Sequence, residues 1–151
     1  MVARFKKVTY YSLRYEKDTR NLFERFINRI DPVLYKDDLG ILRSWMSKIG
    51  DRNGANITLF RPELKAGALP PPIESSSLRL YCMRISDITV ILFDGCVKTA
   101  QKAQDCPNCR PRFREANAFA AAIDRLIVDR EIMIDEQTDE LMFDENLTIE
   151  L

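Results

Sequence analysis

Two consecutive apolar and β-branched segments, residues 78–85 and 88–93, constrain the fold more than any other feature of the chain. Ser86 and Asp87 alone separate the segments, and such a short connection indicates a tight turn between paired strands. The sequence therefore predicts an antiparallel hairpin. Asp94-Gly95 is expected to end the second strand, with residues 96–99 following as an extended exit.

Helical periodicity marks three other parts of the chain. Asp18 or Thr19 is expected to cap the first helix, Asp31-Pro32 to end it, and Gly50 to end the second helix. The first two helices should form a hairpin lying on the sheet. Apolar residues recur at helical spacing over 22–30, from 39 to 49, and over 112–129.

The remaining segments predict short strands and one loop. Residues 4–15 should form a first strand, 57–60 a short extended piece, and 65–77 a loop with three consecutive prolines. Two strands around 136–139 should form a small hairpin near the C-terminus. Strands adjacent in sequence, with segregated helices, predict an α+β fold. Its parts are an N-terminal strand and a helical hairpin packed on a small antiparallel sheet, a C-terminal helix and a short acidic β tail.

The distribution of charge divides the chain into a basic body and an acidic end. The 151 residues have zero net charge, but residues 1–114 carry 21 Lys and Arg against 12 Asp and Glu, a net charge of +9. Residues 115–151 carry 2 basic and 11 acidic residues, a net charge of −9. We therefore expect one domain over 1–130, facing a polyanion, and an acidic tail over 131–151, a possible β-hairpin packed on the same domain.

The expected cellular compartment determines the expected redox state of the cysteines. No secretory signal or membrane-spanning apolar run is visible, so we expect a cytoplasmic protein without a membrane partner. Its four cysteines are then expected to be reduced. Cys106 and Cys109 form a CxxC motif, interpreted as a loop with two thiols. A zinc site would require Cys82 and Cys96 to converge with this pair, and no metal is expected.

The chain contains no histidine, which excludes Ser-His-Asp and Cys-His catalytic arrangements. None of the five glycines forms a phosphate-binding loop. Any catalysis would use Arg, Lys, Tyr, Asp, Glu or Cys. Side chains alternate along a strand, so Arg79 lies on one face of the predicted hairpin and Arg84 on the other. With Lys98 and Arg61, they could gather at one rim of the sheet.

These residues also carry a resemblance to a known family. The Arg79-Leu-Tyr start of the hairpin, the aliphatic strand, the glycine before Val97-Lys98-Thr99 and the alanine-rich helix resemble the RelE/HigB toxin superfamily and related phage-derived proteins. The resemblance covers about residues 57–128. Members of this superfamily are mRNA endoribonucleases of toxin–antitoxin pairs, and many cut mRNA in the ribosomal A site. Their order of elements agrees with the one predicted here, although the acidic tail has no counterpart.

The resemblance implies an RNA-binding, metal-independent endoribonuclease with no cofactor, in which an RNA 2′-hydroxyl attacks the adjacent phosphate. Arg79 matches the arginine on the hairpin, and Lys98 matches a basic residue after the last strand. Both would stabilise transition-state charge. Arg61 and Arg84 are carried over as nearby catalytic candidates. Glu63, Tyr81 or a lysine of lowered pKa would serve as the general base, and the choice stays open.

The resemblance also implies partners, namely mRNA, the ribosome or both, and an antitoxin of the helix-turn-helix kind. Residues expected to follow the RNA backbone are Lys102, Arg110, Arg112 and Arg114.

Two alternatives to the toxin hypothesis remain. The missing histidine and the reduced basic cluster favour a catalytically inactive interaction module on the same fold. A weaker hypothesis is a thiol-based sensor that uses Cys106 and Cys109. The acidic tail could fold back over the basic face and oppose RNA binding, or it could dock an antitoxin by strand addition.

Overall fold

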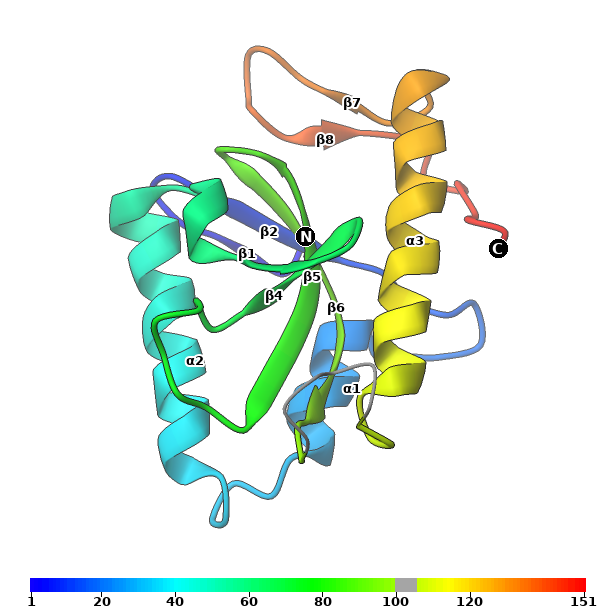
Figure 1. The fold of residues 1–151 in the computed structure, drawn as a ribbon. Helices are drawn as coiled ribbons and strands as arrows, with labels where there is room; N and C mark the ends of the chain where they lie inside the picture. The colour runs from blue at the N-terminus through cyan, green and yellow to red at the C-terminus, as the bar shows by residue number, and fades with distance from the viewer. Residues whose placement is uncertain (100–105) are drawn as a thin grey trace.

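The computed structural model describes residues 1–99 and 106–151, which form an α+β fold (Figure 1). Six strands form one sheet in the order β1-β2-β6-β5-β4-β3, and two more form a separate pair. The strands are β1 (Ala3–Arg4), β2 (Thr9–Ser12), β3 (Arg61–Glu63), β4 (Ala66–Leu69), β5 (Leu78–Ser86), β6 (Thr89–Val97), β7 (Met133–Ile134) and β8 (Leu141–Met142). The helices are α1 (Leu22–Arg29), α2 (Lys36–Lys48) and α3 (Arg110–Val128).

Strands β5 and β6 form the predicted antiparallel hairpin at the centre of the sheet. Their alternating side chains supply two hydrophobic cores, one on each face. Tyr81 and Phe93 pack in the core on the α3 face, whereas Leu80 and Leu92 pack in the core with α1 and α2. Figure 1 shows the sheet between α2 and α3. The strands of the hairpin are almost continuously apolar because both of their faces are buried.

The predicted end of the second strand at Asp94-Gly95 is wrong, because β6 continues to Val97. The register between β5 and β6 shifts opposite Leu80 and Cys82, where β6 contains an extra residue. Such a bulge interrupts the alternation of side chains without ending the strand. Beyond it, Gly95 pairs with Leu80 on the α1 face, and Cys96 pairs with Arg79 on the α3 face.

The sequence predicts a purely antiparallel sheet. This prediction is wrong in one place, because β2 pairs with β6 in the parallel direction. The predicted first strand is also divided, since β1 turns back to pair with β2. The helices α1 and α2 and strands β3 to β5 lie between these two parallel strands in the sequence. A long connection of this kind is what a parallel pair requires.

Part of the predicted proline-rich loop is a strand. Residues 66–69 form β4 between β3 and β5, and the expected extended piece at 57–60 is mostly a 3-10 turn over Ile57–Leu59. Ala66 and Ala68 are buried in the core on the α3 face, and the amide of Ala66 donates to Asn117 Oδ1 on α3 at 3.0 Å. Weak local strand propensity is outweighed here by pairing and burial.

The helix boundaries differ from the predicted ones by a few residues. Asn21 caps α1 in a reciprocal capping box with Glu24, in place of Asp18 or Thr19. Gly50 does not stop the second helix. The chain continues as a π-turn over Ile49–Asn53 and leaves it at Gly54, whose φ is +72°.

The acidic tail forms the predicted hairpin of β7 and β8, but its contacts lie at the β1–β2 edge and on α3. Leu141 donates its amide to Tyr11 Oη at 2.9 Å, and Glu140 forms an ion pair with Arg4 at 2.5 Å. Leu147 and Ile149 pack against the core on the α3 face. Figure 1 shows the hairpin beside the end of α3. No helix among the described residues has the length and apolar character needed to cross a membrane.

Candidate functional site

A cluster of charged side chains forms where β3, β5 and the end of β6 approach one another. Its members shift one another's pKa values, and they are Arg61, Glu63, Arg79 and Lys98. Cys96 pairs with Arg79, and the amide of Lys98 donates to the carbonyl of Ser77 at 2.6 Å, so Lys98 lies beside the start of β5. On the other side, Arg61 reaches the same region from β3, through pairing with β4. Pairing between distant strands therefore brings together Arg79, Lys98 and Arg61, three of the four predicted catalytic residues.

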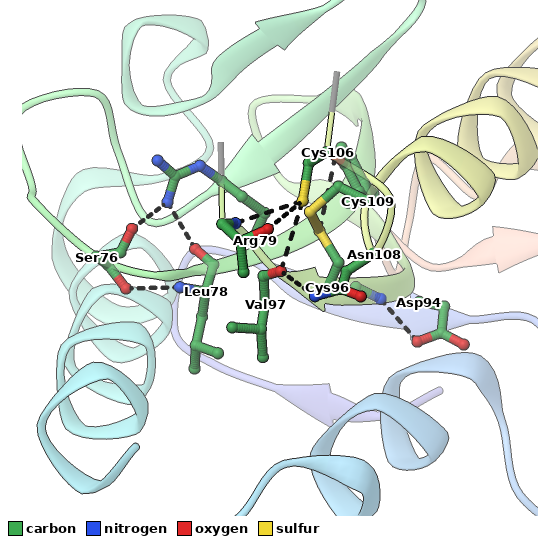
Figure 2. Close-up of a disulfide and its surroundings, with 12 residues drawn as sticks. Ser76, Leu78, Arg79, Asp94, Cys96, Val97, Cys106, Asn108 and Cys109 are labelled. Carbon is green, nitrogen blue, oxygen red and sulfur yellow. Dashed lines mark hydrogen bonds between the residues drawn. A yellow bond between two sulfur atoms is a disulfide. The ribbon is translucent and has the colours of Figure 1, made fainter. Parts of the chain in front are cut away.

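Arg79 is a buried cation, only 7% exposed. Its Nη1 donates to the carbonyls of Ser76 at 2.7 Å and Leu78 at 2.8 Å (Figure 2). In the described part of the chain, no carboxylate lies within ion-pair distance of this guanidinium. Burial and the nearby charge of Arg61 lower the pKa of Arg79. An arginine nevertheless stays charged in a protein, so this site holds a buried positive charge.

Lys98 and Glu63 complete the electrostatic cluster. Burial, Arg79 and Arg61 lower the pKa of Lys98, while Glu63 opposes the effect. Burial raises the pKa of Glu63, and the opposing field of Lys98, Arg79 and Arg61 does not cancel this shift. The pKa of this carboxyl group therefore shifts towards neutral pH, and such shifts are typical of acid–base groups in active sites.

A hollow of about 550 Å³ opens beside this cluster. Arg79 and Lys98 supply its positive charge, and a run of serine hydroxyls lines its wall. The one carboxylate in the wall, Asp38, accepts from the Ser76 hydroxyl at 2.9 Å and the Ser77 amide at 3.1 Å. Two cations outnumber it, so the hollow suits a polar anionic ligand. Its lining residues are Asp38, Ser75, Ser76, Ser77, Arg79, Lys98 and Thr99.

Arg61 also binds backbone carbonyl groups, which the sequence did not predict. Its guanidinium donates to the carbonyls of Pro70 at 2.8 Å, Pro71 at 3.2 Å and Glu74 at 2.6 Å. These bonds hold the proline segment that leads into β5. Arg61 thus contributes its charge to the cluster while its donors are engaged by the backbone.

Arg84 lies away from the other three predicted catalytic residues. It is near the far end of β5, where it donates to the carbonyl of Ala55 and forms an ion pair with Asp87. It lines a different hollow, of about 570 Å³, together with Lys6 and Lys7. Arg84 is five positions beyond Arg79 along an extended strand, so the two cannot share one rim.

The predicted RNA-backbone residues lie at the start of α3, except for Lys102, which is outside the described residues. Arg110 and Arg114 are exposed. Arg112 forms ion pairs with Asp94 at 3.6 Å and with Glu115 at 3.7 Å. The roles of these residues in RNA binding stay predictions.

Asp94, which the sequence predicted only as the end of a strand, is a buried acidic residue. It is 1% exposed, and its carboxylate accepts hydrogen bonds from Arg29 on α1 at 2.7 and 3.3 Å. Arg112 approaches it from α3. One carboxylate therefore interacts with helices from both faces of the sheet, next to the strand end that carries Lys98.

The prediction that all four cysteines are reduced is wrong, because Cys96 and Cys109 form a disulfide. It joins β6 to the residue that caps α3. Cys106 and Cys82 are free thiols. Cys82 lies in the core on the α1 and α2 face, so the four cysteines do not converge. Among the described residues, no group of three or more acidic, cysteine or histidine side chains is arranged to bind a metal.

Comparisons with known proteins add no relative from which a role could be transferred. The chain matches no protein-family model, and neither the curated proteins nor the solved structures yield a significant match.

Proposed function

We propose that this chain is a metal-independent endoribonuclease of the toxin class, acting on mRNA at the hollow beside Arg79. The observation that carries the proposal is the guanidinium of Arg79, which is buried without a carboxylate partner among the described residues. A buried charge is costly unless it is paired. An RNA phosphate would supply the missing anion, and its oxygens suit the planar donors of arginine.

The residues support one chemical step, in which an RNA 2′-hydroxyl attacks the adjacent phosphorus and the 5′-oxygen leaves. Arg79, with Lys98 beside it, would bind the phosphate oxygens and stabilise the charge that develops on them. Exposed Arg110 and Arg114 would bind neighbouring phosphates electrostatically. The step requires no cofactor.

Glu63 is the favoured general base for removing the 2′-hydroxyl proton. Its pKa is raised by burial, which brings the carboxylate closer to the basicity that proton abstraction near neutral pH requires. Burial raises the pKa of Tyr81 above the ordinary value for a phenol. Tyr81 is therefore protonated at neutral pH and can donate a hydrogen bond but cannot act as the base.

Replacing Glu63 with glutamine is expected to lower the cleavage rate about a hundredfold or more, the usual contribution of a general base. A base acts when deprotonated, so wild-type activity should rise with pH through the Glu63 pKa, which lies above the usual value for glutamate. The variant should lose this acidic limb. Rates measured from acidic to neutral pH test both points, and an unchanged acidic limb in Glu63→Gln would exclude Glu63 as the base.

The proposed function as a whole is tested by inducible expression in a bacterial host. Wild-type protein is expected to arrest growth and fragment mRNA, and the double variant Arg79→Ala/Lys98→Ala to do neither. The matched control is Arg43→Ala/Arg125→Ala, which also removes two cations, both from exposed helical positions. Normal growth and intact mRNA with soluble wild-type protein would reject the nuclease and favour the interaction module.

A further inference from the structure

Three cysteines meet where β6 ends and α3 begins. Cys96 is disulfide-bonded to Cys109, the N-cap residue of α3, with 5.2 Å between their Cα atoms. Cys106 lies three residues before Cys109 in the same turn, and its carbonyl accepts from the Cys109 amide at 3.1 Å. Figure 2 shows this corner. A free thiol is thus held in the turn that carries one half of a disulfide.

The surroundings of the Cys106 thiol favour its ionised form. The amide and the hydroxyl oxygen of Thr99 each lie 3.3 Å from Cys106 Sγ. Burial opposes ionisation, but hydrogen bonds from Thr99 and from the amides of Cys109 and Asn108 outweigh it and lower the pKa of Cys106 to about 7. Burial instead raises the pKa of Cys82, the other free thiol. Of these two thiols, Cys106 is therefore the better nucleophile.

We propose that Cys96, Cys106 and Cys109 form an internal thiol–disulfide exchange site in which Cys106 is the attacking thiol. The Cys106 thiolate attacks Sγ of Cys109, the Cys96–Cys109 bond breaks, and a Cys106–Cys109 bond forms. Cys96 leaves as a thiolate and takes up the proton that Cys106 lost. Each side of the exchange contains one disulfide and one thiol, so no external oxidant or reductant is consumed.

The exchange would change the connection between α3 and the sheet. In the described state the disulfide joins α3 to β6, whereas the Cys106–Cys109 bond would lie within the turn before α3. Cys96 is the cross-strand neighbour of Arg79, and its Sγ lies 3.9 Å from Tyr81 Oη. The released thiolate would therefore form beside the Tyr81 hydroxyl, which can donate a hydrogen bond to it.

The test is alkylation of the native, unreduced protein at neutral pH, followed by tryptic mapping. Cys96 falls in peptide 85–98, and Cys106 and Cys109 share peptide 103–112. Exchange should place the label on Cys96 and leave peptide 103–112 lacking two hydrogens, as an internal disulfide. Label on Cys106, with the two peptides still cross-linked, would overturn the proposal.

Three single-cysteine variants extend the test. Cys106→Ala should slow labelling of Cys96 about tenfold or more, because the attacking thiolate is gone. Cys82→Ala removes the other free thiol and should behave as wild type. In Cys96→Ala, oxidised glutathione should produce the disulfide within peptide 103–112. A persistent free Cys106 in that variant, folded by circular dichroism, would also overturn the proposal.

Discussion

Replacing Arg79 with alanine is expected to lower the rate of mRNA cleavage about a hundredfold to a thousandfold, the usual cost of removing one donor that stabilises transition-state charge. Arg79→Lys should recover only part of this loss. Lysine keeps the positive charge but has a single ammonium group, which cannot bind two phosphate oxygens with a planar fork. The measurement is the rate of cleavage of a defined mRNA in a translation extract, so that ribosome-dependent activity is also detected.

The control for this experiment separates loss of chemistry from loss of structure. Arg43→Ala removes a cation from an exposed position on α2 and should cleave at the wild-type rate. Each variant should also be compared with wild type by thermal unfolding, because Nη1 of Arg79 donates to two backbone carbonyls. A folded Arg79→Ala protein that cleaves at the wild-type rate would contradict the proposed site.

Gly95→Ala is expected to destabilise the protein by about 3 kcal/mol or more, a severe case of overpacking. A Cβ atom at this position would lie 2.4 Å from the carbonyl oxygen of Arg79 and 2.8 Å from the ring of Phe26. The backbone contact cannot be relieved by a side-chain rotation, so β5 and β6 would have to separate at the bulge. Chemical denaturation should show the loss, together with a Tm lower by about 10 °C.

Gly40→Ala is the matched control, since it adds the same methyl group in open space. Apart from its chain neighbours and the backbone of its own helix, no described atom lies within 4 Å of a Cβ built on Gly40, an exposed position in α2. Alanine is a better helix former than glycine, so this variant should gain about 0.5–1 kcal/mol. Similar stability for the two glycine variants would show that the close approach at Gly95 does not constrain the bulge.

Local sequence patterns predicted most of the elements. Two consecutive apolar and β-branched segments with a two-residue turn identified β5 and β6, and helical periodicity identified α1, α2 and α3. The alternation of side chains along a strand correctly separated Arg79 from Arg84, which lie on opposite faces of β5 and in different surroundings. These predictions succeed because periodicity reports directly which side chains an element must bury.

The bulge in β6 accounts for the position of Cys96, whose disulfide is at odds with the reduced cysteines expected from the missing secretory signal. Strict alternation puts Cys96 on the face of Leu92, away from α3. The extra residue in β6 turns Cys96 towards α3, where it bonds to Cys109. The bulge also directs Gly95 towards α1, and pairing with β5 carries the strand on to Val97, past the predicted break. One inserted residue moves every side chain beyond it to the opposite face of the strand. The local composition does not show where such a residue is inserted.

Residue type and periodicity were sufficient for the α+β class, the central hairpin, and the basic body with its acidic tail, whereas Arg79 and Lys98 were singled out by the family resemblance. Other features depend on contacts between distant segments. These are the parallel pairing of β2 with β6, the strand β4, the bonds of Arg61 to the proline segment, the burial of Asp94 against Arg29, and the disulfide. Their energies come from pairing, burial and charge compensation across the chain, which a local pattern of residues does not contain.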